Sequence, residues 1–140
     1  MTDTLRLLMP QWQGGNNPAY AFGAGLLAWL APGADTTTVQ AEVPVEVENG
    51  RELLPENGVV AQSVLLRQLR SAAKIIDAYQ PERIVVFGGD CLVAQAPFAY
   101  LNGLYGGKLG VLWLDAHPDI SNPGMFWHEH AMVLGNLLGE

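Results

Sequence analysis

Two short apolar runs, each followed at once by a polar motif, constrain the fold of this chain more than any other feature. The runs are Ile84–Phe87 and Val111–Leu114. Apolar side chains at every position are typical of parallel strands covered on both faces. Ligands of parallel α/β sheets collect outside the carboxyl ends of the strands. We therefore expect two buried strands whose ends carry the chemically active side chains.

The rest of the chain alternates strand and helix patterns. Leu5–Met9 is a nearly all-apolar run that stops at Pro10, and it predicts a buried strand. Between Thr36 and Val47 valines alternate with polar residues, and Pro44 places this strand at a sheet edge. Apolar spacing and helix breakers predict helices at 24–30, 59–79, 92–104 and 131–138. In the longest of these, the basic side chains should lie away from the apolar stripe: Arg67, Arg70 and Lys74.

This alternation favours an α/β fold in three layers, with a mostly parallel sheet flanked by helices. Residues 1–140 contain no repeat, low-complexity segment or linker, which indicates one domain.

Composition narrows the class of partners. Acidic residues outnumber basic ones 14 to 7, so a broad basic face for nucleic acid is not expected. No apolar run approaches the ~20 residues that span a bilayer, and Met1–Thr4 lacks the basic start of a secretory signal. The single cysteine, Cys91, excludes a disulfide framework and fits a reducing compartment. We expect a cytoplasmic protein that binds neither nucleic acid nor membrane.

Asp115, His117 and Asp119 follow the second apolar run at a spacing of two. In an extended or gently turning segment, such residues can point to the same side. Carboxylate oxygens and an imidazole nitrogen suit Mn, Zn or Fe rather than Cu(I). The alternative is that Asp115 caps the following turn while the other two bond loop backbone. For the pattern in isolation, that alternative is favoured, since short patterns recur by chance.

Three motifs in order change this balance: Phe87-Gly88-Gly89-Asp90-Cys91, Leu114-Asp115-Ala116-His117-Pro118-Asp119 and His128-Glu129-His130-Ala131-Met132. Their order resembles the arginase, agmatinase and formimidoylglutamase family, whose members carry Gly-Gly-Asp-His, Asp-Ala-His-x-Asp and a later His-Gly. The resemblance is strong from about Ile84 onward and weak before it. It implies the N-terminal portion of an arginase-like domain. A nucleotide-binding domain is less favoured, because the glycine turn lacks G-x-G-x-x-G spacing or a GK[ST] ending.

The resemblance implies a role for each matching position. Asp115 would bridge two manganese ions and take part in catalysis, His117 would bind one ion and Asp119 the other. His130 matches the later His, which in the family lies near the substrate and relays protons. The implied reaction is hydrolysis of a linear C–N bond in a small guanidino or amidino compound. Metal-bound hydroxide would attack the central carbon, and an acid would protonate the leaving amine.

Cys91 stands where the family usually has a metal-binding His, and two readings of it remain open. A thiolate ligand suits Zn or Fe better than Mn, whereas a small buried hydrophobe would serve only packing. Ala131 also replaces the family's Gly. We interpret His128 and the loop 11–17 as ordinary loop residues.

The family's remaining metal carboxylates lie in a downstream Asp-x-Asp motif, which residues 1–140 do not contain. We therefore expect an incomplete domain whose metal centre needs ligands from another segment or chain. Its unpaired sheet edge and uncovered helix faces favour a homo-oligomer. The alternative to a hydrolase is a non-catalytic subunit of the same fold that acts through binding or assembly.

Overall fold

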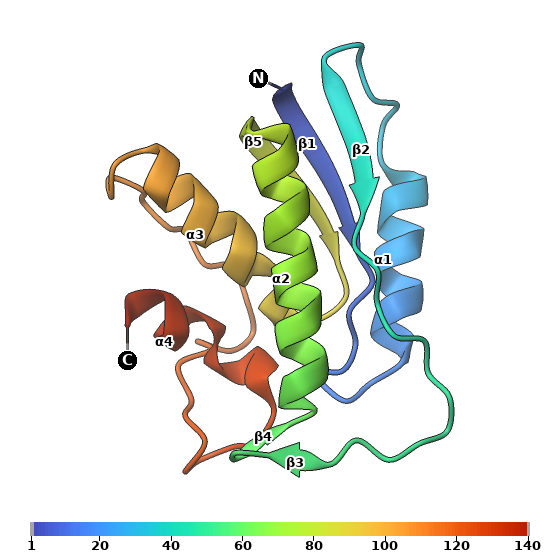
Figure 1. Cartoon of the computed structure of the whole chain (residues 1–140), viewed down its shortest axis with the longest axis vertical. Coiled ribbons are helices and arrows are strands. Elements are labelled where there is room, and N and C mark those ends of the chain that lie inside the picture. Colours follow the sequence, from blue (N-terminus) through green and yellow to red (C-terminus); the bar gives the residue numbers. More distant parts are fainter. Residues whose placement is uncertain (1, 140) are drawn as a thin grey trace.

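Three parallel strands form the central sheet of this computed structural model, which describes residues 2–139. The strands are β1 (Thr2–Met9), β2 (Thr38–Glu42) and β5 (Pro81–Gly88), in the order β2-β1-β5 (Figure 1). Leu5 of β1 lies opposite Val39 on one side and Ile84 on the other. The apolar run of β1 is therefore central and buried, as predicted. β2 is an edge strand, as predicted, but it is shorter than the predicted strand. It ends at Glu42, so the alternating valines and Pro44 that carried the prediction lie in the loop that follows.

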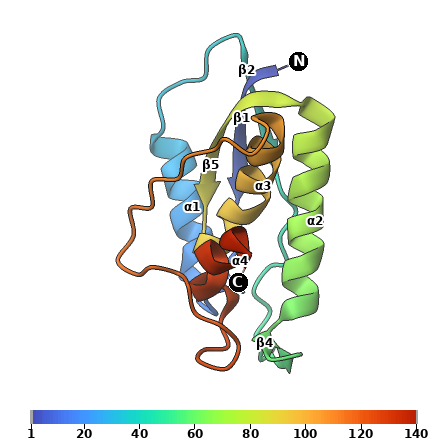
Figure 2. The ribbon, with the colours of Figure 1, turned by 90° about the vertical axis from the view of Figure 1, so that its left-hand side faces the viewer.

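Helices cover both faces of the sheet. Figure 2 shows α1 (Ala19–Leu30) and α2 (Gln62–Tyr79) on opposite sides of it. A short 3-10 helix, η1 (Cys91–Ala94), leads from β5 into α3 (Gln95–Leu104), which packs against α2. A second, η2 (Glu129–Met132), leads into α4 (Val133–Leu138). This arrangement confirms the predicted α/β fold with a parallel sheet between helices.

The starts of all four predicted helices shift. α3 begins at Gln95 and α4 at Val133, because the 3-10 helices η1 and η2 precede them. α1 begins at Ala19, earlier than Ala24. α2 begins only at Gln62, because Val59–Val60 forms strand β4, which pairs with β3 (Pro55–Glu56). None of the helices within residues 2–139 combines the length and apolarity needed to cross a bilayer.

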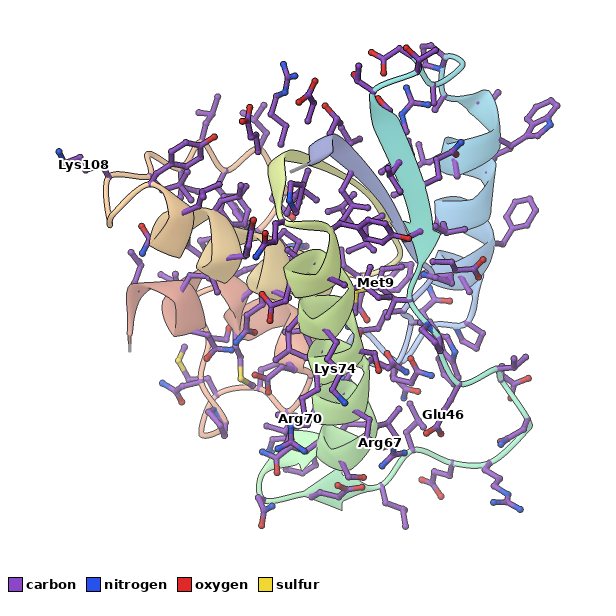
Figure 3. All side chains as sticks on the ribbon, turned by 45° about the horizontal axis from the view of Figure 1, so that its top comes forward. Met9, Glu46, Arg67, Arg70, Lys74 and Lys108 are labelled. Carbon is purple, nitrogen blue, oxygen red and sulfur yellow. The ribbon has the colours of Figure 1, made fainter. Side chains whose placement is uncertain are left out.

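The main core lies between the sheet and α2. Ala72 and Ile76 of α2 are fully buried against Leu5 and Leu7 of β1. The basic side chains lie on the outer face of the helix, as the apolar spacing predicted: Arg67, Arg70 and Lys74 (Figure 3). Arg67 also pairs with Glu46 of the loop that follows β2 (Figure 3).

The prediction that Val111–Leu114 is a buried strand is wrong. This segment forms no strand, and only Trp113 reaches the apolar cluster around Leu92 and Val133. Leu112 is 81% exposed and Leu114 is 86% exposed. Apolar composition favours burial, but a strand also needs a partner for its backbone groups. Within residues 2–139, β5 pairs with β1 and with no other strand.

The open edge of β5 has a further consequence. Val85, in the middle of the strand, is 42% exposed. The expectation that Ile84–Phe87 is covered on both faces is therefore met only in part.

Candidate metal centre

The candidate site begins at the carboxyl end of β5, where Gly89 packs directly on the backbone of Gln11. A Cβ atom on Gly89 would lie 1.9 Å from the carbonyl oxygen of Gln11, so no other residue fits this position. The N–H of Gly89 donates to Met9 O at 3.1 Å, and the N–H of Asp90 donates to Gln11 O at 2.9 Å. These contacts hold the turn after β5 against the end of β1.

Asp90 organises this turn from a buried position. Its carboxylate accepts hydrogen bonds from Gln11 Nε2 (2.9 Å), Gly14 N (2.8 Å) and Leu92 N (3.1 Å). Burial raises the pKa of Asp90 to about 6, although the three donors oppose this shift. Gly14 in turn accepts a bond from the backbone N–H of His130 at 3.3 Å. Asp90 thus links the loop after β1 to the start of η1 and, through Gly14, to η2.

Three of the four residues predicted as metal ligands lie together beyond this turn. Cys91 Sγ and one carboxylate oxygen each from Asp115 and Asp119 all lie within 4.8 Å of one another. The Cys91 thiol donates to Asp115 Oδ2 at 3.5 Å. We call these three residues the donor cluster.

Asp119 is the most buried member of the donor cluster, at 3% exposure. Its Oδ2 atom is buried and has no hydrogen-bond partner among the residues that the structure describes. An unsatisfied buried polar group costs about 1–3 kcal/mol, and more when it is charged. A cation in the cluster would remove this cost, and the donor set of two carboxylates and a thiol suits a divalent metal. The residues present therefore fit a metal ion.

Cys91 is half-buried at the boundary between the cluster and the apolar core. Burial raises the pKa of its thiol well above the ordinary value, and the charges of Asp119 and Asp115 add to the shift. The thiol is therefore protonated at neutral pH when no cation is present. A metal ion reverses this balance, because a coordinating thiol is deprotonated outright.

His117 lies outside the donor cluster, with its side chain 79% exposed. Its backbone N–H donates to Asp115 Oδ1 at 2.9 Å, which lowers the pKa of Asp115. The His117 Nδ1 atom is 3.9 Å from the same oxygen. Asp115 consequently lies between two potential ligands, with Oδ2 toward Cys91 and Oδ1 toward His117.

His130 is half-buried beside the cluster. Its ring centroid lies 6.3 Å from that of Phe126 and 6.4 Å from that of His128. Burial lowers the pKa of His130, and the negative charge of Asp119 opposes the shift. The imidazole is therefore neutral at neutral pH. His128 is more enclosed than we expected from the sequence, since its Nδ1 atom is buried and lacks a partner within residues 2–139.

The loop 11–14 supports the site in a way that the sequence did not indicate. Gln11 and Gln13 are fully buried. Gln13 Nε2 donates to Glu46 O at 2.7 Å, and Gln13 Oε1 accepts from Gln68 Nε2 at 3.2 Å. These partners are distant in the chain, so a glycine- and asparagine-rich loop offered no signal beyond its turn chemistry.

Comparison with known proteins identifies one family. A sequence model of the arginase family matches residues 32–139. The match includes all three motifs and starts well before Ile84, so the likeness also covers β2 and α2. No curated protein matches the chain.

Proposed function

Because this chain belongs to the arginase family, we propose that it acts in metal-dependent hydrolysis of linear C–N bonds in small guanidino or amidino compounds. The observation that carries the proposal is the donor cluster at the carboxyl end of β5, with the buried, unpartnered oxygen of Asp119. Parallel α/β sheets bind their ligands at this end.

The proposed metal ligands follow from the positions of the side chains. Cys91 and Asp119 would hold one ion together with Asp115, whose other oxygen faces His117 and would share a second ion with it. Manganese is the metal that the family resemblance implies. When bound, such ions lower the pKa of a water molecule and so supply a nucleophile at neutral pH.

His130 is the residue of this chain that we propose to move a proton. Its lowered pKa keeps the imidazole neutral at neutral pH, so it can accept a proton and then pass that proton to a leaving amine. The rings of Phe126 and His128 lie beside it, with centroids 6.3 Å and 6.4 Å from its own. Its backbone is held by the bond from its N–H to Gly14 O.

We also propose that the chain self-associates and is cytoplasmic. α1 exposes large apolar side chains, including Phe22 at 75% and Trp29 at 79%, and such patches favour association. The single, unpaired cysteine fits a reducing compartment.

The test is hydrolysis of a panel of guanidino and amidino compounds by the metal-loaded chain. The readout is release of an amine together with urea from a guanidino compound or an amide from an amidino compound. Asp115→Asn should abolish turnover. Asp77→Asn, an exposed carboxylate on α2, is the matched control and should leave turnover unchanged. Wild-type turnover in Asp115→Asn would reject the proposal.

A non-catalytic subunit of the same fold is the second candidate. It is favoured by the position of His117, which lies outside the donor cluster. This candidate predicts a stable oligomer without stoichiometric metal, and a metal-loaded, active preparation would exclude it.

A further inference from the structure

The donor cluster contains the sulfur atom of Cys91, and a sulfur ligand affects which metal ion a site prefers. We propose that Cys91, Asp115 and Asp119 form a site for one thiophilic divalent cation, which takes Zn²⁺ in preference to Mn²⁺. The inference rests on the metal site of the proposed function and is independent of whether hydrolysis takes place.

The chemistry of the donors favours zinc. Mn²⁺ prefers carboxylate, carbonyl and water oxygens, whereas thiolate ligands select Zn, Cu(I) or iron–sulfur clusters. For a given set of N, O and S ligands, Zn²⁺ also binds more tightly than Mn²⁺. A thiolate beside two carboxylates therefore increases the general preference of protein ligands for Zn²⁺ over Mn²⁺.

The spacing of the donors agrees with this assignment. In a tetrahedral zinc site, a sulfur ~2.3 Å and an oxygen ~2.0 Å from the metal lie about 3.5 Å from each other. Cys91 Sγ and Asp115 Oδ2 are 3.5 Å apart. This distance already corresponds to the separation of two ligands on one zinc ion.

Asp119 provides a second, independent observation. Its residue is 3% exposed, and its Oδ2 atom is buried without a hydrogen-bond partner in residues 2–139, which points to a missing positive partner. The backbone around it is fixed, because the carbonyl of Asp119 accepts a bond from Gly135 N at 3.1 Å. Cys91 is equally fixed at the start of η1, where Asp90 forms the N-cap. The backbone is thus held in place at two of the three ligands before any ion binds.

The three ligands found within residues 2–139 leave one position of a tetrahedral zinc site for water, substrate or a further ligand. Catalytic zinc sites have this composition, with water or substrate in the fourth position.

Cobalt is the probe that tests sulfur ligation directly. The full chain is stripped with a chelator and titrated with Co²⁺. We expect a thiolate-to-cobalt charge-transfer band in the near ultraviolet that saturates at one cobalt per chain. One equivalent of Zn²⁺ should remove the band, and one equivalent of Mn²⁺ should not.

Two variants separate the sulfur from the rest of the site. Cys91→Ser should lose the band and bind Zn²⁺ at least about tenfold more weakly, the lower end of what even supporting residues contribute to metal affinity. Its Mn²⁺ affinity should change little. Cys91→His should restore metal binding without the band and reduce the Zn²⁺ to Mn²⁺ affinity ratio. Circular dichroism checks that each variant is folded.

A wild-type cobalt complex without the charge-transfer band would overturn the inference, as would equal affinities of the wild-type chain for Zn²⁺ and Mn²⁺. The wild-type spectrum requires no variant to fold. Hydrolysis with Mn²⁺ and without sulfur ligation would reject this inference and leave the proposed function standing. Zinc bound through sulfur without any hydrolysis would support this inference and reject the proposed function.

Discussion

The buried carboxylate of Asp90 accepts a hydrogen bond from the backbone N–H of Gly14 at 2.8 Å, across 76 residues of sequence. The same side chain accepts bonds from Gln11 and Leu92. Gly14 then accepts the N–H of His130. One carboxylate therefore joins the end of β1 to the start of η1 and, through Gly14, to η2, and the surroundings of the donor cluster depend on it.

Replacing Asp90 with Asn should destabilise the chain by about 1–3 kcal/mol. The amide oxygen can replace one carboxylate oxygen and accept from Gln11 and Leu92. The amide nitrogen would then face the N–H of Gly14, where two donors meet and neither is satisfied. Urea unfolding of the metal-free wild type and variant measures the difference. An equal midpoint and slope in both would contradict this role.

The stability contribution of Asp90 should depend on pH. Burial raises the pKa of this carboxyl from 3.8 to about 6, so the folded chain holds the proton more tightly than the unfolded chain. The resulting stability is fully present below about pH 4 and is lost as the pH rises through about 6. Relative to Asp90→Asn, the wild type should gain about 1 kcal/mol between pH 7 and pH 5. Urea titrations at pH 5, 6 and 7 measure the free energy of unfolding of both proteins. A difference between them that stays constant with pH would contradict the prediction.

Gly89→Ala should cost about 3 kcal/mol or more, because its Cβ would overlap a backbone atom that cannot move independently. The added atom would lie 1.9 Å from Gln11 O. Gly103→Ala is the matched control, since a Cβ there meets nothing within 4 Å and the residue lies in α3. It should be neutral or stabilise by up to about 1 kcal/mol. Thermal unfolding measures the stability of both variants. Similar changes in stability would argue against the close contact between Gly89 and Gln11.

Amide hydrogens of Val111–Leu114 should exchange almost as fast as in an unfolded chain. In the part of the chain that the structure describes, none of their N–H groups donates a backbone hydrogen bond. Ile84–Phe87, paired with β1, should be protected up to the free energy of global unfolding. Native-state exchange followed by mass spectrometry distinguishes the two segments. Equal protection would mean that Val111–Leu114 forms a strand after all.

Asp119→Asn should weaken metal binding without lowering the stability of the metal-free chain. In the metal-free chain the variant should be at least as stable as the wild type, because it removes a buried carboxylate whose pKa is raised by burial. Asn also tolerates the left-handed backbone at this position, where φ is 49°. With Zn²⁺ at about 100 times its dissociation constant, the wild type should gain about 2.7 kcal/mol, and the variant should lose most of this gain. Thermal shifts with and without Zn²⁺ measure both effects, and an equal zinc-induced shift in the two proteins would contradict the ligand role.

The sequence alone determined the elements whose signals are local. Leu5–Met9 is a nearly continuous apolar run, and Leu65, Ala72 and Ile76 follow a helical spacing of three to four residues. Both signals lie in neighbouring residues. The three ordered motifs likewise indicated the family, and the family match covers all of them.

Only the tertiary structure decided which of these local features meet. His117 and Asp119 belong to one motif, yet one side chain is 79% exposed and the residue of the other is 3% exposed. Val111–Leu114 has the composition of a strand but lacks a paired neighbour. Asp90 and Gly14 show no mutual signal in the sequence. In each case the outcome depends on a partner distant in the chain, and burial and hydrogen bonding between such partners arise only when the chain is folded.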